Sequence, residues 1–452
     1  MRNLKTNLIG GSACVLFAAL APAVAGAENF WAFADQKPAW LTEASLGLKE
    51  TYDDNVFLAG ADSQYLPAYT VPAGSVAALE NRSSLVTTVS PKLAVNFSPL
   101  LGQRSVWQLL SLAYAPDFVL FHNQPSESYD AQRVVAGVKA RSGAFAFSAD
   151  DTFTYVDGNS VGPFYPGALF NANYAAAVRE RREQIQDKAS VNFQYDAGRF
   201  FFRPTASLLL YDMMTDLRDI TGYQNYSSRY DVNGGADFGY RVWPQSAITL
   251  GYRYGHQYQE QFSFLPYSSP SDYQRVLVGL EGKPWHWLEV KILGGPDFRQ
   301  YPGDTATHIT PVNDRNPVKP YGEALLVATL TGKDAVTFKF KEWEWVSSIG
   351  KIPYLESTYD LGYHRKLTDK LGLDLGGRLL SSDYTGGNIS NSHRNDWDYQ
   401  FTAGLSYAVN PHISVNLAYT RELGRSMADN VENDQTRAFD RDLIMLGAIV
   451  KF

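Results

Sequence analysis

The sequence contains a single cysteine, Cys14, which lies in an apolar run close to the start of the chain. Basic residues precede this run and small residues follow it, a pattern typical of a secretory signal peptide with cleavage after Ala25 or Ala27. We therefore predict a signal peptide over residues 1–27 and a mature chain that contains no thiol. A chain without thiols has no disulfides, no zinc–thiolate sites and no cysteine nucleophile.

The rest of the chain also lacks long hydrophobic runs and an excess of basic residues over acidic ones. After residue 27 no apolar run reaches about 18 residues, the length that a membrane-spanning helix needs. Without Arg2 and Lys5 the chain has 38 basic residues against 47 acidic ones, a net charge of −9. We expect no nucleic-acid partner, because nucleic-acid binding requires a basic face.

Motifs for catalysis and metal binding are scarce too. The seven histidines show no metal-ligand spacing, and the chain has neither a nucleophile elbow nor a glycine-rich phosphate loop. We therefore expect no cofactor, no metal and no enzymatic activity. If the chain is an enzyme after all, Asp304 with His308 is a candidate pair.

The chain does contain repeated alternation of apolar and polar residues with the period of a β-strand. It is clearest between Gln184 and Tyr195, where apolar residues occupy every second position from 189 onward. The same alternation returns at 248–254, 396–407 and 413–420. Segments with one apolar and one polar face suit a barrel that has lipid outside and water inside.

Short and long connections alternate between these segments. Eight short connections and nine long ones imply about eighteen strands, with sixteen or twenty as alternatives. We predict an all-β fold, a single closed antiparallel transmembrane β-barrel over residues 44–452 with short periplasmic turns and long extracellular loops. Residues 28–43 form a periplasmic leader in this interpretation, and either the leader or a loop could plug the lumen.

One predicted strand is irregular. Between Val336 and Trp345 the apolar positions change from even to odd, which predicts a β-bulge near Lys341. Tryptophans lie near the ends of the predicted strands, as expected for the two lipid interfaces of a barrel. Those near short turns are Trp107, Trp243, Trp285 and Trp287, and those near long loops are Trp343, Trp345 and Trp397.

The final stretch, Arg441 to Phe452, ends in an aromatic residue and has an apolar face at every second position back from it. This stretch resembles the assembly signal of Gram-negative outer-membrane β-barrels, with Phe452 as its terminal aromatic residue. The resemblance implies a location in the outer membrane of a Gram-negative bacterium, with outer-membrane lipid and the barrel assembly machinery as partners. It also implies that the last strand closes the barrel against the first, near Leu46 and Leu48.

The polar faces of the predicted strands carry the charged residues that would line the lumen. The basic ones are Lys49, Lys92, Arg133, Lys139, Lys188, Arg203, Arg241, Arg253, Arg275, Lys291, Lys339 and Arg378. The acidic ones are Asp231, Asp237, Glu281, Glu289, Glu356, Asp360, Asp374, Asp396 and Asp398. These charges either pair across strands and keep the lumen wet, or form a basic arc opposite an acidic arc that selects weakly by charge. Charge reversal at Arg253 and Arg275 is the test that the sequence suggests.

The long connection 157–181 leads into a run, 168–184, with the best helix-forming composition in the mature chain. A helix folded inward would narrow the pore with Arg179, Arg181 and Arg182. A helical cap outside the barrel is the alternative.

Residues Thr51 to Leu58 read T-Y-D-D-N-V-F-L. They resemble the opening strand of the β-barrel porin 2 group of outer-membrane proteins, some members of which are associated with exopolysaccharide export. The resemblance implies the fold more than any substrate. We expect a porin that passes small polar solutes passively through a water-filled, charged lumen, with a conduit for exopolysaccharide export as the alternative. A homo-oligomer is left open.

Overall fold

The computed structural model describes residues 38–56, 58, 83–102, 105–159, 182–214, 227–261, 268–302, 314–346, 353–384, 394–428 and 439–452. Within these ranges the alternating segments form nineteen strands. They are β1 (Leu41–Asp53), β2 (Ser84–Asn96), β3 (Trp107–Tyr114), β4 (Asp117–Phe121), β5 (Tyr129–Ser142), β6 (Phe145–Asn159), β7 (Arg182–Ala197), β8 (Phe200–Met214), β9 (Arg229–Trp243), β10 (Ser246–Gln259), β11 (Ser271–Trp285), β12 (Leu288–Gln300), β13 (Val318–Thr329), β14 (Asp334–Trp345), β15 (Tyr354–Lys366), β16 (Leu371–Tyr384), β17 (Arg394–Ala408), β18 (Ile413–Ala428) and β19 (Phe439–Lys451). The predicted signal peptide and most of the leader lie outside the described residues.

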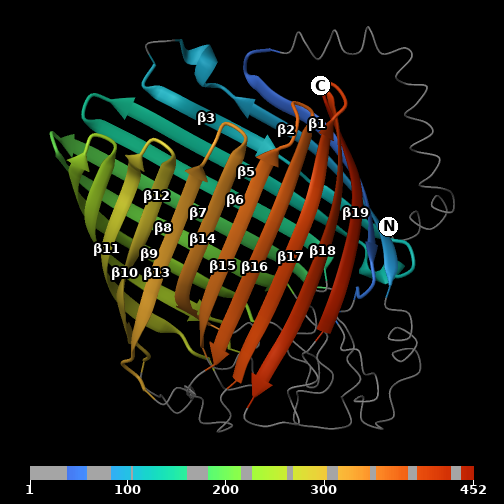
Figure 1. Cartoon of the computed structure of the whole chain (residues 1–452). Helices are drawn as coiled ribbons and strands as arrows, with labels where there is room; N and C mark the ends of the chain where they lie inside the picture. Colours follow the sequence, from blue (N-terminus) through green and yellow to red (C-terminus); the bar gives the residue numbers. More distant parts are fainter. Residues whose placement is uncertain are drawn as a thin grey trace.

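The strands close into one antiparallel barrel with eighteen positions around its wall (Figure 1). Strands β3 and β4 share one of these positions, because β2 and β5 each pair with both of them. Short 3₁₀ turns, η2 (Ser98–Leu101) and η3 (Pro125–Glu127), flank this interrupted position. The predicted all-β barrel of about eighteen strands is therefore confirmed.

The ring is closed where the last strand meets the first. Leu46 faces Val450 and Leu48 faces Ala448 in the antiparallel register of β1 and β19. The backbone N–H of Phe452 donates to the carbonyl oxygen of Ala44 at 2.8 Å. The pairing that the sequence predicted for the final strand is present, and Figure 1 shows β19 beside β1.

The two faces of the wall differ in polarity as the alternation predicts. On β10, Ile248, Leu250 and Tyr252 are exposed on the outer face, whereas Thr249 and Gly251 are buried toward the lumen. Apolar side chains on the outside and polar ones inside are what a barrel needs in order to stand in lipid. In the part of the chain that the structure describes, no helix is long and apolar enough to cross a membrane.

Tryptophans near the short connections occupy the outer rim. Trp107, Trp243, Trp285 and Trp287 are all exposed there, in agreement with the prediction of an aromatic row at a lipid interface. Trp343 and Trp345 were expected at the other interface, and this prediction is wrong. Both side chains are buried, with Trp345 only 2% exposed.

The β-bulge predicted near Lys341 is also wrong. Strand β14 pairs with β13 and with β15 without any shift in register. Its pairing with β13 ends at Glu342, opposite Gly322, while its pairing with β15 continues to Trp345, opposite Tyr354. The apolar positions change because the end of β14 leaves β13 and packs inside the barrel, not because an extra residue is inserted.

Deletion of Phe452 should lower the amount of folded barrel several-fold. The deletion removes both the final hydrogen bond of the closing pair and the aromatic ring of the expected assembly signal. Heat-modifiable migration of membrane fractions on gels measures the folded share. Phe452→Tyr, which keeps an aromatic ring, is the control and should fold like the wild type. Equal folding of the deletion and the wild type would remove Phe452 from the assembly signal.

Candidate functional site in the lumen

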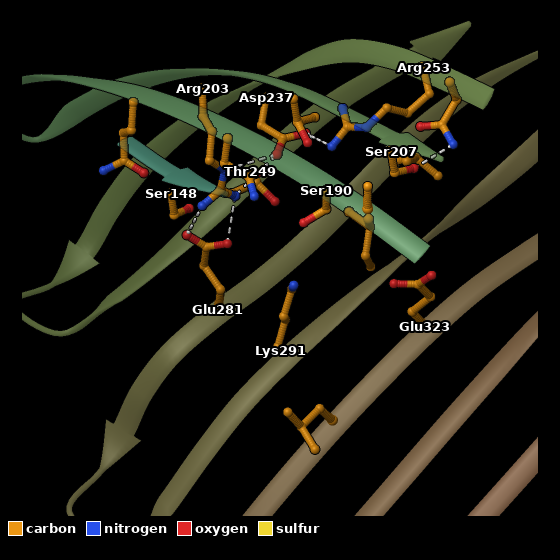
Figure 2. Close-up of a pocket in the computed structure, with 18 of the residues that line it drawn as sticks. Ser148, Ser190, Arg203, Ser207, Asp237, Thr249, Arg253, Glu281, Lys291 and Glu323 are labelled. Carbon is orange, nitrogen blue, oxygen red and sulfur yellow. Dashed lines mark hydrogen bonds and ion pairs between the residues drawn. The ribbon is translucent and has the colours of Figure 1, made fainter. Parts of the chain in front are cut away.

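The lumen contains a cavity of about 930 Å³ on the side of the barrel formed by β3 and β5–β14. Hydroxyl and amide side chains are spread over its wall, and Figure 2 shows Ser148, Ser190, Ser207 and Thr249 among them. These groups both donate and accept hydrogen bonds. The cavity can therefore replace part of the hydration shell of a polar solute.

Cations outnumber anions on the cavity wall. Nine lysines and arginines line it, against four carboxylates. Two of these carboxylates belong to one arginine-centred network (Figure 2): Arg203 donates to both oxygens of Glu281, at 2.9 and 2.7 Å, and to Asp237 at 3.1 Å. Arg253 lies 2.7 Å from the second oxygen of Asp237. This network ties β8, β9, β10 and β11 together on the inside of the wall.

The other two carboxylates of the cavity also have partners. Asp231 accepts hydrogen bonds from the Tyr273 hydroxyl at 2.8 Å and from the Gln257 amide at 2.9 Å. Glu323 accepts one from Tyr321 at 2.6 Å. Every acidic group on the cavity wall is therefore engaged by a neighbouring side chain.

Four of the cations differ from the rest. Lys139, Lys188, Lys291 and Lys339 are exposed to the cavity, and they form no ion pair or hydrogen bond within the part of the chain that the structure describes. Charges of one sign in a cleft with low-dielectric walls raise the local concentration of ions of the opposite charge. This side of the lumen has a positive potential although the chain as a whole has a net charge of −7.

The end of β14 packs inside the barrel, at the end of the barrel where the long connections lie. We call residues Trp343–Val346 the inturned segment. Its backbone is held by side chains of β9, β10 and β12: Arg229 donates to the Val346 carbonyl at 3.1 Å, and Gln257 and Arg299 each donate to the Glu344 carbonyl at 2.9 Å. These bonds replace those that β13 supplies to the earlier part of the strand.

Aromatic stacking fixes the two tryptophans of the inturned segment. Trp343 stacks on Trp345 with ring centroids 4.5 Å apart. The guanidinium of Arg229 lies over Trp345 at 5.3 Å and over Tyr211 at 5.2 Å. Leu209 also packs against this group. The segment therefore spans the space between β8 and the β13 side of the wall.

A buried ionic network fixes Glu344 of the same segment. Arg299 lies 3.1 Å from Asp297 and 3.7 Å from Glu344, and none of these three side chains is appreciably exposed. Lys319 is 3.5 Å from Glu344. Tyr301, just past the end of β12, donates to the same carboxylate. Burial, together with this carboxylate, raises the pKa of Tyr301 well above its ordinary value, so its hydroxyl keeps the proton that it donates.

The structure distributes the predicted lumen residues over two regions. Lys139, Lys188, Arg203, Arg253, Arg275 and Lys291 line the cavity. Arg241 lies closer to the short turns, 2.5 Å from Asp196, at a smaller cavity of about 430 Å³. The remaining predicted residues lie on strands outside the large cavity: Arg378 is 3.8 Å from Asp360, Asp374 is 2.7 Å from His364, and Asp396 and Asp398 belong to β17. A selective role for any of them stays a prediction.

Arg253 and Arg275 are poor probes of selectivity. Arg253 is paired with Asp237, and Arg275 is buried with its Nε 2.8 Å from Asp297. Reversing either charge would place two like charges together in a buried site. Among the cations that line the cavity, the four lysines are the ones that are exposed and lack an ion-pair partner in the described part of the chain. The sequence pattern does not separate these lysines from the arginines, because ion pairing depends on the distances between side chains of different strands.

The predicted helical constriction falls largely outside the described residues. Arg179 and Arg181 lie in one undescribed connection, and Asp304 and His308 lie in another. Arg182 is the first residue of β7. The sequence pattern did not predict the inturned segment, although the change of apolar face at Trp343 and Trp345 marks its position in the sequence. Among the described residues, no group of three or more metal-ligating side chains is placed to hold an ion.

The closed wall, the apolar outer face and the charged, hydrogen-bonding lumen define an outer-membrane type of β-barrel. Solved structures similar to this chain include the outer membrane protein OpdK of Pseudomonas aeruginosa, at 11% identity over 91% of this chain and 99% of that one, with a TM-score of 0.41. OccK3 (OpdO) of the same organism has 12% identity over 91% and 96%, with a TM-score of 0.42. The siderophore receptor PirA of Acinetobacter baumannii has 8% identity over 91% and 81%, with a TM-score of 0.40.

At these identities and TM-scores the similarities carry no argument about what this chain transports. No family model and no curated protein matches the chain. The functional argument therefore rests on the lumen itself.

Replacing Trp343 and Trp345 together by alanine should raise the single-channel conductance. The change removes the stacked rings that hold the inturned segment against Tyr211 and Arg229, and widens the path. Conductance steps in planar bilayers measure the effect. Trp285→Ala with Trp287→Ala is the matched control, because this pair is also stacked but lies on the outer face. A double variant at Trp343 and Trp345 with the wild-type conductance would show that the segment does not restrict flow.

Replacing Arg299 by methionine should destabilise the barrel by up to about 3–5 kcal/mol, because Asp297 and Glu344 would each lose one buried cation and keep only Arg275 and Lys319 respectively. Denaturant unfolding of the reconstituted protein measures the change. Arg378→Met is the control: it breaks an exposed pair with Asp360 and should cost under about 1 kcal/mol. Similar losses for the two variants would contradict a stabilising role for the buried network.

Proposed function

We propose that this protein is an outer-membrane porin that passes small polar solutes passively. The observation that carries the proposal is the cavity of about 930 Å³, lined by polar and charged side chains, inside a closed barrel with an apolar outer face. A polar lumen in a barrel of this strand number is suited to hold water.

Transport in this proposal needs neither turnover nor a cofactor. A solute enters the lumen, exchanges some of its water for hydrogen bonds to groups such as Ser190, Ser207 and Thr249, and leaves along its concentration gradient. The inturned segment limits solute size at the end with the long connections. The four free lysines bias passage toward anions.

Export of an exopolysaccharide is the alternative that the sequence suggested. A chain of sugar rings would have to pass the inturned segment, whose backbone is held by Arg229, Gln257 and Arg299. This arrangement favours small solutes over a polymer. Loss of surface polymer on deletion of the gene, with uptake of small solutes intact, would favour export instead.

Purified, folded protein should form ohmic conductance steps in a planar bilayer and should make liposomes permeable to small sugars and amino acids but not to dextran. The reason is that solutes would be sieved at the inturned segment. A heat-unfolded sample is the control for detergent leakage. Folded protein that gives neither steps nor swelling would reject the porin proposal.

A further inference from the structure

We propose that Lys139, Lys188, Lys291 and Lys339 form a binding site for small anions that carry two or three separated carboxylate groups. The inference rests on the proposed function, since it assigns a substrate class to the same cavity. It goes beyond a charge preference, because it requires saturable binding.

The four lysines reach one cavity from two walls of the barrel. Lys139 and Lys188 stand on β5 and β7, and Lys291 and Lys339 stand on β12 and β14. In Figure 1, β5 and β7 lie behind β12 and β14. All four side chains line the same space and are exposed to it. The four lysines therefore reach the cavity from strands on either side of it.

The lysines on β12 and β14 are free because the carboxylates opposite them are held elsewhere. Lys291 faces Glu281 in the register of β11 and β12, but both oxygens of Glu281 accept hydrogen bonds from Arg203. Lys339 faces Asp360 in the register of β14 and β15, and Asp360 lies 3.8 Å from Arg378. Arginine competes well for such carboxylates because its planar guanidinium can bind them in a bidentate manner.

Neutral residues face the other two lysines. Lys139 lies opposite Ser148 on β6, and Lys188 lies opposite Thr152 on β6 and Leu209 on β8. Asp150, between Ser148 and Thr152 on β6, is a diagonal neighbour of both lysines, and it accepts a hydrogen bond from Ser190 at 2.9 Å. The Ser148 hydroxyl can donate a further hydrogen bond to a solute held by these lysines.

The arrangement favours a ligand with separated charges over one compact anion. A lysine ammonium is a point charge with three donors, so each of the four can hold a different oxygen pair. Inorganic phosphate is compact and would reach the lysines of one wall only. A di- or tricarboxylate can contact both walls at once.

The test uses tricarballylate, a trianion, added to the wild-type channel in a planar bilayer with potassium chloride. We expect partial block of the ion current that saturates with concentration. Replacing all four lysines by glutamine should weaken the apparent affinity for tricarballylate by about tenfold or more. This is the loss expected when several solvent-screened charge contacts are removed together. Acetate and inorganic phosphate at equal charge concentration should block more weakly.

The matched control removes equal charge from the rest of the lumen, by Lys49→Gln, Lys92→Gln, Arg133→Gln and Lys451→Gln together, and leaves Arg378 in place on Asp360. This variant should retain block with the wild-type affinity. If tricarballylate still blocks the fourfold lysine variant with wild-type affinity, the proposed site is wrong. If the affinity falls equally in the control variant, a diffuse electrostatic field explains the block and the site is also wrong. Phosphate that blocks as well as tricarballylate overturns the carboxylate class.

Two further measurements separate the binding site from the proposed function. If the folded protein conducts no current, the porin proposal fails, and calorimetric titration of the detergent-solubilised barrel with tricarballylate then decides the site alone. If the fourfold cavity variant does not fold, the pairs Lys139→Gln with Lys291→Gln and Lys188→Gln with Lys339→Gln replace it. Unchanged tricarballylate affinity in both pairs overturns the site.

Discussion

Backbone hydrogen bonding imposes the constraint on which this structure depends. Hydrocarbon offers no partner to a peptide group, so each strand must find both neighbours inside the wall. The pairing of β1 with β19 meets this requirement by removing the free edges. Once the wall is a closed ring, strand alternation forces one set of side chains toward lipid and the other into a shared interior. The charges of the lumen are therefore a consequence of closure.

Local patterns in the sequence were enough to predict the wall. Strand number follows from period-two alternation and connection length, and the closing partner follows from the final strand. Lys139 and Lys188 could be placed on the polar face because facing depends only on position along a strand. These properties are set by a few neighbouring residues, so the sequence contains them directly.

Pairing inside the lumen could not be predicted in the same way. Arg203 on β8 reaches Glu281 on β11, and this contact is what leaves Lys291 without its nearest acid. Such contacts depend on how sharply the wall curves, which no local pattern specifies. Likewise, a change of apolar face at Trp343 has two physical causes, a bulge or a strand that leaves its neighbour. The partners that decide between them, Arg229 and Arg299, come from other strands.

The departure of β14 from β13 makes the wall mechanically uneven. Residues Val318–Tyr321 pair with β12 on one side, while the pairing of β13 with β14 starts only at Gly322. This short stretch is held to the next strand through side chains such as Lys319 and Glu344, where most of the ring uses backbone bonds. Under lateral pressure or a change of bilayer thickness, the ring should yield at points such as this one and the interrupted position of β3 and β4. A barrel wall can thus contain a hinge without containing a gap.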